Sequence, residues 1–169
     1  MKNYDEAINC ILRESKLGDI VIGSTGYISR ILYENQKYHQ DKHFFYSQGS
    51  MGLAPAIALG IVMSNPNVNV LVLNGDGATL MNFGTAFNIL TKKKKHEIGG
   101  RIKVVVLKNG TYASVGGHEI GVDFEIPEEL DSVYTSIDVS EPTTRKIERV
   151  GVLMTDNAQH IREILNAKK

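Results

Sequence analysis

The sequence predicts a single α/β domain, a three-layer sandwich in which helices cover both faces of a mostly parallel β-sheet. Two continuous apolar runs, residues 70–73 and 102–107, are typical of strands buried on both faces. Segments with apolar residues at helical spacing alternate with these runs and with other strand candidates, which is the pattern of a parallel sheet. A chain of 169 residues suits one such domain, spanning 1–169, and is too short for two.

Five elements are expected in the first half of the chain. The first helix is amphipathic and ends at Gly18, and the β-branched run after it indicates the first strand. Asn65 and Pro66 end the third helix, because proline does not continue a helix. The expected elements are, in order, a helix over 4–16, a strand over 19–23, a helix through 28–32, a strand over 43–46 and a helix over 53–63.

The second half is expected to hold three strands and two helices. Four lysines in the charged loop from Lys92 to Gly100 follow a helix, where the helix dipole favours positive charge. Asp156 and Gln159 have the spacing of a cap at the start of the last helix. The expected elements are a strand over 70–73, a helix over about 79–92, a strand over 102–107, a weaker strand over 133–139 and a helix ending at Ala167.

Composition and charge exclude several classes of function. Lys plus Arg and Asp plus Glu both number 19, so the chain lacks the cationic excess that nucleic-acid or acidic-membrane binding requires. Cys10 is the only cysteine, which rules out an internal disulfide and suits a reducing compartment. The apolar run over 56–63 is too short to span a membrane, and acidic residues interrupt the N-terminal segment where a signal peptide needs an apolar core. We therefore expect a cytoplasmic protein that binds neither nucleic acid nor membrane.

Glycine-containing turns follow four of the predicted strands. Because the carboxyl ends of parallel strands lie at one edge of a sheet, these turns are expected to meet where α/β proteins bind ligands. The turns are residues 24–26, 49–52, 75–77 and 109–110.

Two polar residues at this edge indicate a metal site. Gly75-Asp76-Gly77 lies between a buried strand and a helix, where glycines allow close backbone approach and helix N–H groups favour an anion. The Asp76 carboxylate would repel a phosphate unless a divalent cation lay between them. Mg²⁺ takes carboxylate, amide and phosphate oxygens together, and Asn109 supplies an amide oxygen after the next buried strand. Taken singly, each motif is more simply a plain tight turn, and it is the two together, each at the end of a continuous apolar strand, that favour a metal site.

The same segments resemble a known family. GDGATLMNFGTAFNIL followed by VVVLKNGTY looks like the cofactor motif of thiamine diphosphate enzymes, and FFYSQGSMGLAPAIALGI looks like their cofactor-ring loop. Together with DIVIGSTGYISRILYE, these segments are similar to the cofactor-binding portion of the sulfopyruvate and phosphonopyruvate decarboxylases. The resemblance covers about residues 17–117, with the motifs in the family's order. It implies the diphosphate-binding (PP-type) fold, with thiamine diphosphate and Mg²⁺ as cofactors.

The resemblance also implies roles at the diphosphate end of the cofactor. Asp76, the Asn109 side chain and the backbone carbonyl of Thr111 would ligate Mg²⁺. The residues that would contact the diphosphate are Thr25, Gly26, Gly75, Gly77 and Ala78, with Tyr112 packed nearby.

At the ring end, the Gly49 carbonyl would accept a hydrogen bond from the aminopyrimidine, and Met51 would be the wedge that bends the cofactor. An unbranched thioether side chain can fill the space inside the bent cofactor without strain. For Met51 and for Tyr112, an ordinary packing role is the alternative.

Three features depart from the family pattern. Lys108 stands where the first of two asparagines is usual, and the segment from Lys92 to Gly100 lengthens the connection between Gly77 and Asn109. His118 lies where relatives carry a glutamine-like residue, and it could contact an acidic substrate or transfer a proton. A surface position without catalytic role is the alternative for His118.

Enzymes of this family need a second domain, whose glutamate protonates the pyrimidine ring of the cofactor. The chain is too short to hold that domain, so the resemblance implies a β-type subunit of a hetero-oligomeric lyase that is active only with a separately encoded pyrimidine-binding α subunit. The expected reaction is decarboxylation of a small anionic 2-oxo acid such as sulfopyruvate or phosphonopyruvate.

Three alternatives remain open from the sequence. The chain could belong to a carboligase of the acetolactate synthase type, or it could be a non-catalytic module that keeps the metal–diphosphate site. A flavodoxin-like nucleotide binder would need neither a metal nor Asp76.

Overall fold

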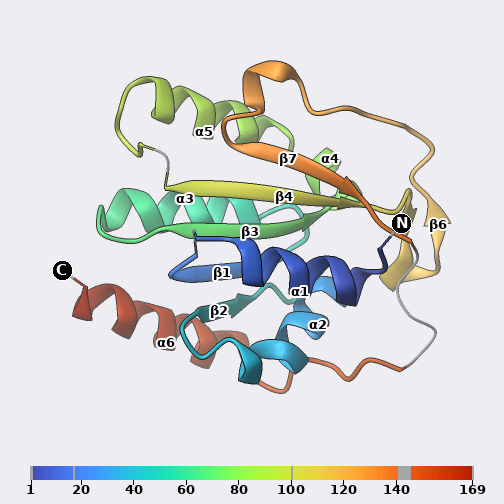
Figure 1. The fold of residues 1–169 in the computed structure, drawn as a ribbon, viewed down its shortest axis with the longest axis horizontal. Helices are drawn as coiled ribbons and strands as arrows, with labels where there is room; N and C mark the ends of the chain where they lie inside the picture. The colour runs from blue at the N-terminus through green and yellow to red at the C-terminus, as the bar shows by residue number, and fades with distance from the viewer. Residues whose placement is uncertain (1, 17, 100, 141–145, 169) are drawn as a thin grey trace.

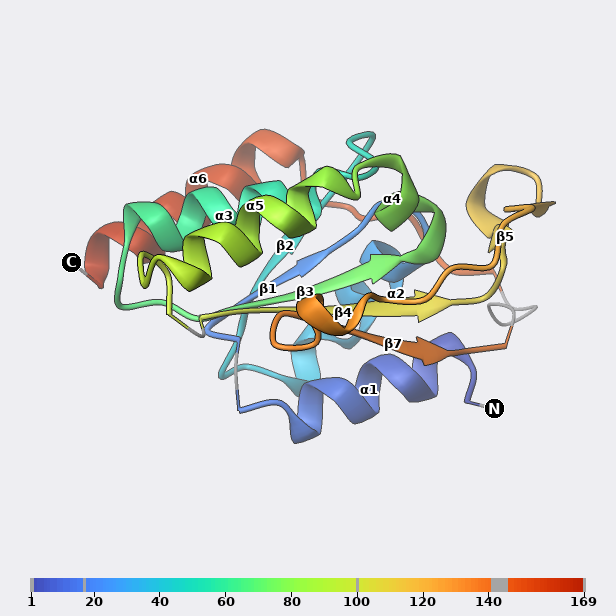
Figure 2. The same cartoon turned by 90° about the horizontal axis from the view of Figure 1, so that it is seen from above.

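The computed structural model describes residues 2–16, 18–99, 101–140 and 146–168. Within them, five parallel strands form one sheet in the order β2-β1-β3-β4-β7, with helices on both faces (Figures 1 and 2). This confirms the predicted α/β sandwich. The strands are β1 (Ile20–Gly23), β2 (His43–Tyr46), β3 (Val70–Gly75), β4 (Ile102–Lys108) and β7 (Tyr134–Asp138).

Alternate residues of the central strands enter two separate cores. Ile20 and Ile22 of β1 pack on the face covered by α3 (Ala54–Ser64), α5 (Gly84–Lys94) and α6 (Met154–Ala167). Val21 packs on the opposite face, against α1 (Tyr4–Glu14) and α2 (Tyr27–Asn35). Figure 2 shows the two helical layers on either side of the sheet. Burial on both faces explains why β1, β3 and β4 have continuous apolar sequences.

One expected helix is in fact two. The sequence predicts a helix over about 79–92, but α4 (Asp76–Met81) begins directly after β3 and ends before Asn82, and α5 starts at Gly84. At Asn82 the backbone leaves the helical region (φ −140°, ψ 47°), and its side-chain amide donates to the Gly52 carbonyl at 3.2 Å. This tertiary bond favours a break that local periodicity does not indicate.

The expected cap of the last helix is also wrong. Helix α6 begins at Met154, its N-cap is Leu153, and no side chain caps it. Asp156 lies within the first turn, where a negative charge is favourable to the helix dipole. Leu153 shows no capping signature, which is why the sequence placed the start too late.

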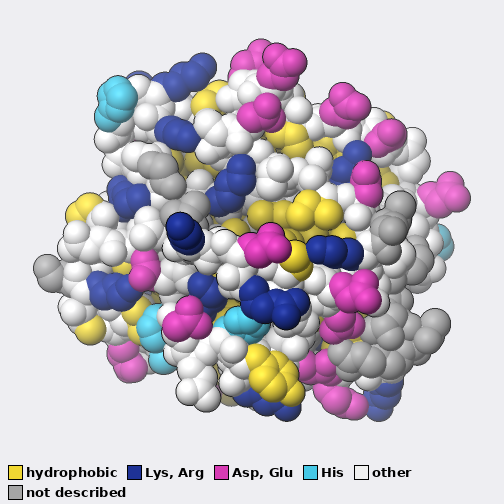
Figure 3. Space-filling model, in the orientation of Figure 1, with side chains coloured by type: hydrophobic (Ala, Val, Ile, Leu, Met, Phe, Trp, Pro, Cys, Tyr) yellow, Lys and Arg dark blue, Asp and Glu magenta, His cyan; other side chains and the backbone are white. Residues whose placement is uncertain are grey.

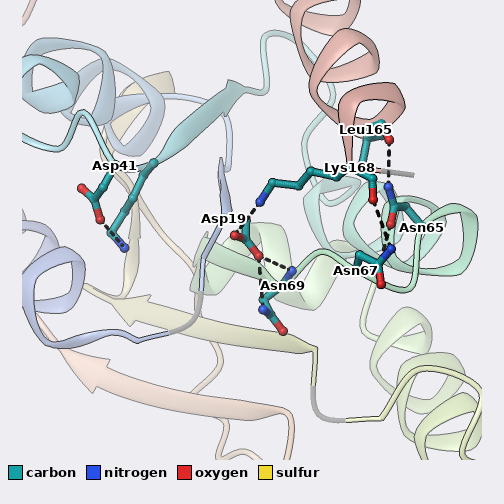
Figure 4. Close-up of polar contacts among 8 residues, drawn as sticks. Asp19, Asp41, Asn65, Asn67, Asn69, Leu165 and Lys168 are labelled. Atoms are coloured by element: carbon teal, nitrogen blue, oxygen red, sulfur yellow. Dashed lines mark hydrogen bonds and ion pairs between the residues drawn. The ribbon is translucent and has the colours of Figure 1, made fainter.

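Polar side chains attach α6 to the sheet. Near its C-terminal end, Lys168 Nζ lies 2.7 Å from Asp19 Oδ1, and Asn69 donates to Asp19 Oδ2 from both its backbone and its side chain (Figure 4). Near the N-terminal end of the helix, the Asn157 side chain accepts from Tyr46 N at 2.9 Å and donates to Phe44 O at 2.8 Å. One donor and one acceptor of the edge strand β2 are thereby paired with α6, which hinders pairing with a further strand at that edge.

Charged side chains of both signs are interspersed over the face seen in Figure 3, in keeping with the equal numbers of acidic and basic residues. Lys92–Lys94 form the last turn of α5, and Lys92 pairs with Glu97 at 2.6 Å in the loop that follows. Gly100, at the end of the predicted insertion, lies outside the described residues. No helix in the described ranges is both long and apolar enough to cross a membrane.

Candidate functional site

A pocket opens at the carboxyl edge of the sheet, between the ends of β1 and β3. In the sheet, β2 pairs with one side of β1 and β3 pairs with the other side. The strand order therefore reverses between β1 and β3, which is the switch point at which α/β sheets bind ligands. Three of the four predicted turns contribute to the pocket, together with residues that follow the fourth. Its lining includes Ser24, Thr25, Met51, Gly75, Asp76, Gly77, Ala78, Thr111, Tyr112, Ser114 and Val115.

Asp76 is the charged residue at the centre of this edge. Its side chain is 4% exposed and accepts three backbone hydrogen bonds. Oδ1 accepts from Gly77 N at 2.8 Å, and Oδ2 accepts from Asn109 N at 2.9 Å and from Gly110 N at 2.7 Å. The carboxylate therefore links the start of α4 to the turn after β4.

Asn109 lies directly against this carboxylate, as its backbone bond to Asp76 shows. Its side chain donates from Nδ2 to Thr111 Oγ1 at 2.7 Å, and Thr111 N donates back to Asn109 Oδ1 at 3.4 Å. A carboxylate, an amide and the nearby Thr111 carbonyl give an oxygen donor set of the kind that Mg²⁺ prefers. The described residues contain no group of three or more His, Cys, Asp or Glu that could hold a metal by themselves, so the neutral oxygens are essential to such a site.

Asn74 supports Asp76 from the end of β3, and sequence reasoning missed it. It is fully buried, and its Nδ2 donates to Thr79 Oγ1 at 2.8 Å while that hydroxyl donates to the Gly75 carbonyl at 2.8 Å. These bonds fix the first turn of α4, from which Asp76 projects. The available signal was an asparagine directly after four apolar residues of a buried strand.

Two glycines allow other residues to lie close over the pocket. A Cβ on Gly77 would collide with the ring of Tyr112. Gly26 has φ +87°, and a Cβ there would lie 2.6 Å from Ser114 Oγ. The segment 112–115 therefore packs directly on the turns after β1 and β3. Ser114 and Val115 of this segment line the pocket, and the sequence motifs did not indicate them.

The ring-end candidates divide between two neighbouring pockets. Met51 lines the first pocket together with Asp76 and Thr25. Gly49 and Gly26 line a second pocket, between the ends of β1 and β2. Met51 and Gly49 thus lie on one loop that borders both pockets.

His118 lies outside both pockets. It forms the two-residue strand β6 (His118–Glu119), which pairs with β5 (Thr111–Tyr112), and its side chain is exposed. The pairing places His118 opposite Tyr112, so it lies beside the site without lining it.

Lys108, where the family pattern has asparagine, anchors the loop after β6. Its Nζ lies 3.2 Å from Asp123 Oδ1, donates to the Phe124 carbonyl at 2.9 Å and stacks 5.6 Å from the Phe124 ring centre. The lysine side chain is therefore held by that loop, and Asp76 keeps its bonds to Asn109 N and Gly110 N.

Comparison with known proteins gives a consistent result. Residues 22–147 match the family model of the thiamine pyrophosphate enzymes, C-terminal TPP binding domain. Over 98 residues the chain is 36% identical to the β subunit of sulfopyruvate decarboxylase from Methanothermobacter thermautotrophicus, covering 58% of this chain and 48% of that protein. The β subunit from Methanocaldococcus jannaschii is 35% identical over 102 residues, which cover 60% of this chain and 49% of the relative.

A third relative is a larger protein. The phosphonopyruvate decarboxylase of Streptomyces viridochromogenes is 35% identical over 111 residues, which cover 66% of this chain and 26% of that enzyme. The chain thus spans about half the length of the sulfopyruvate decarboxylase β subunits, and about a quarter of the phosphonopyruvate decarboxylase.

Proposed function

The chain belongs to the thiamine pyrophosphate (thiamine diphosphate) enzymes, and we propose that it is the diphosphate-binding subunit of a decarboxylase for small anionic 2-oxo acids of the sulfopyruvate or phosphonopyruvate kind. The observation that carries the proposal is the contact of Asp76 with the Asn109–Gly110 turn at the switch point of the sheet. We also propose that residues 1–169 act as one PP-type domain. One continuous sheet from β1 to β7 supports this.

In this proposal Asp76, Asn109 and the Thr111 carbonyl would hold Mg²⁺. The donor set fits Mg²⁺. One carboxylate and two neutral oxygens neutralise only one of its two positive charges, so the ion can also bind a diphosphate. Gly77 N–H now donates to Asp76 Oδ1, so a carboxylate turned toward a cation would release this donor for a phosphate oxygen. Gly75, Ala78 and Thr25, which line the same pocket, and Gly26, which lines the neighbouring one, would complete the diphosphate contacts.

Met51 and Gly49 would orient the ring end, Met51 as an apolar wedge and Gly49 through its carbonyl. Tyr112 would shield the diphosphate by packing over Gly77. When bound, thiamine diphosphate supplies the electron sink that makes loss of CO₂ from a 2-oxo acid possible. The contribution of this chain is binding, orientation and exclusion of water.

We propose that a separately encoded pyrimidine-binding α subunit completes the site and supplies the catalytic glutamate. The support is that the two sulfopyruvate decarboxylase relatives are named β subunits, which suggests a separate α subunit. In the complex, His118 would be this chain's candidate for contact with the substrate or for proton transfer, although it is exposed here.

The carboligase and module alternatives are less well supported. The relatives reported above carry decarboxylase names, and no feature of the site favours a carboligase. A flavodoxin-like binder shares this strand order, but it gives no reason for a buried carboxylate beside Asn109.

The decisive experiment is co-expression of the chain with the product of the adjacent gene. The complex is assayed for CO₂ release from a panel of 2-oxo acids, with and without thiamine diphosphate and Mg²⁺. We expect release from sulfopyruvate or phosphonopyruvate only when both cofactors are present. Equal release without Mg²⁺, or transfer of the acyl group to an acceptor in place of release as aldehyde, would overturn the proposal.

A matched set of variants tests the metal role. Asp76→Ala should lower thiamine diphosphate affinity by about 100-fold or more, since even outer-shell partners of a metal contribute roughly 10- to 100-fold. Asp76→Asn keeps the shape of the side chain and separates loss of charge from loss of the turn. Thermal melts of both variants check that the chain is folded, and an unchanged affinity in the folded variants contradicts the metal role.

A further inference from the structure

The second pocket at the carboxyl edge has a composition that the diphosphate site does not explain. It encloses about 230 Å³ between the end of β1, the end of β2 and the segment that precedes α6. A single water molecule needs about 10–15 Å³ of such space, so the pocket has room for a small oxyanion. Its lining includes Gly26, Arg30, Ser47, Gln48, Gly49 and Arg149, with no acidic residue.

Two arginines give this pocket a positive charge in a chain of zero net charge. Neither Arg30 nor Arg149 forms an ion pair with any residue that the structure describes. The Arg30 guanidinium lies 5.4 Å from the Tyr27 ring centre, which limits its freedom. Planar guanidinium groups donate two parallel hydrogen bonds to carboxylate, sulfonate or phosphonate oxygens.

Ser47 supplies a second and independent observation. It is 1% exposed, its backbone N–H donates to the Gly23 carbonyl at 3.0 Å, and its hydroxyl has no hydrogen-bond partner. A buried hydroxyl without a partner is uncommon and costs stability, and Ser47 is one of the residues that line this pocket.

Gln48 holds the two sides of the pocket together. Its side-chain amide donates to the Val152 carbonyl at 2.8 Å, which fixes the segment carrying Arg149 against the end of β2. A specific contact between distant parts of the chain therefore forms the pocket. Arg30 and Arg149 are far apart in the sequence, and the fold brings them to the same pocket.

The pocket lies beside the ring end of the proposed cofactor site. Gly49, whose carbonyl would meet the aminopyrimidine, lines it, whereas Asp76 lies in the first pocket. We infer that Arg30, Arg149 and Ser47 bind the second acid group of the substrate, the sulfonate or phosphonate, while its 2-oxo acid end faces the cofactor. This inference rests on the proposed function and adds the residues that select a doubly anionic substrate.

The test uses the complex with the pyrimidine-binding subunit. Arg30→Gln and Arg149→Gln should each raise the KM for sulfopyruvate or phosphonopyruvate about 10- to 100-fold, since a hydrogen bond to a charged group contributes roughly this factor. Arg162→Gln, at an exposed arginine of α6, is the matched control and should leave KM unchanged. Equal KM values in all four proteins overturn the inference.

Calorimetric titration with 3-sulfopropanoate, which lacks the reactive oxo group, separates this inference from the proposed function. The wild-type complex should bind 3-sulfopropanoate more tightly than propanoate, and the two pocket variants should lose that preference. This holds even if the complex decarboxylates nothing, a result that would refute only the proposed function. Absence of the preference in the wild type overturns the inference. So does a loss of thiamine diphosphate affinity equal to the loss for 3-sulfopropanoate, because the arginines would then serve the cofactor.

Discussion

Gly77 and Tyr112 pack closely at the candidate site. The Tyr112 ring occupies the space that a Cβ of Gly77 would need, and Gly77 itself is buried at the start of α4. Gly84 is the useful comparison, since a Cβ there would meet nothing within 4 Å. The two glycines differ in surroundings: Gly77 lies beneath the Tyr112 ring, and Gly84 has open space around it.

Gly77→Ala should therefore destabilise the chain by about 1–3 kcal/mol, the usual cost of overpacking a filled space. Gly84→Ala should be neutral or stabilising by about 0.4–1 kcal/mol, because alanine restricts the unfolded chain. Urea denaturation of the two variants measures the difference in the free energy of unfolding. If both melt at the same urea concentration, Tyr112 moves aside freely and the contact does not define the site.

His43 gives the stability of the chain a pH dependence. Burial lowers its pKa below the ordinary 6.5, and the neighbouring His160 and Lys168 lower it further, while Asp19 opposes them. His43 thus binds a proton less readily in the folded state than in the unfolded state, so its contribution to stability is complete above pH 6.5 and is lost as the pH drops below that value.

We expect His43→Gln to reduce the fall in melting temperature between pH 7.5 and pH 5.5. Part of the fall should remain, because burial also lowers the pKa of His39. His118→Gln, at an exposed histidine, is the control and should keep the full pH dependence. An identical pH profile in His43→Gln and wild type would contradict the linkage.

At the scale of elements, features that neighbouring residues determine were predictable from the sequence, and features that depend on contacts between distant residues were not. Continuous apolar runs and glycine turns are local features, so the five strands and the meeting of Asp76 with Asn109 were predictable from the sequence. The break at Asn82 depends on a bond to Gly52, thirty residues away, and periodicity does not reveal it. The Arg30–Arg149 pocket likewise depends on the contact between Gln48 and Val152.

Helix α6 depends on tertiary contacts in the same way, and Asn157 is its main polar attachment to the sheet. Asn157→Ala should destabilise the chain by about 2 kcal/mol or more, because it leaves a buried donor and a buried acceptor of β2 unpaired. Asn166→Ala, at an exposed position of the same helix, should have little effect. Hydrogen exchange of the Tyr46 amide provides a local readout, and unchanged protection in Asn157→Ala would contradict the assignment.

At the scale of the whole molecule, the site faces one edge of the sheet and is open. Val115 lines the pocket around Asp76 and is nevertheless 65% exposed, and Met81, at the end of α4, is 61% exposed. A large apolar side chain that lines a pocket and is left exposed is a candidate for contact with another protein. A partner that closes the proposed cofactor site from this edge would bury Val115.

Val115→Asp should therefore weaken association with the pyrimidine-binding subunit by at least about tenfold, because a charge without a partner is costly to bury. Met63→Asp is the matched control. Met63 is 52% exposed but lies near the end of α3, at the opposite edge of the sheet from the pocket. Binding of each variant to the partner is measured by titration, with thermal melts to verify folding. Loss of association in Met63→Asp, with Val115→Asp unaffected, would place the partner at the other edge and leave the pocket around Asp76 open in the complex.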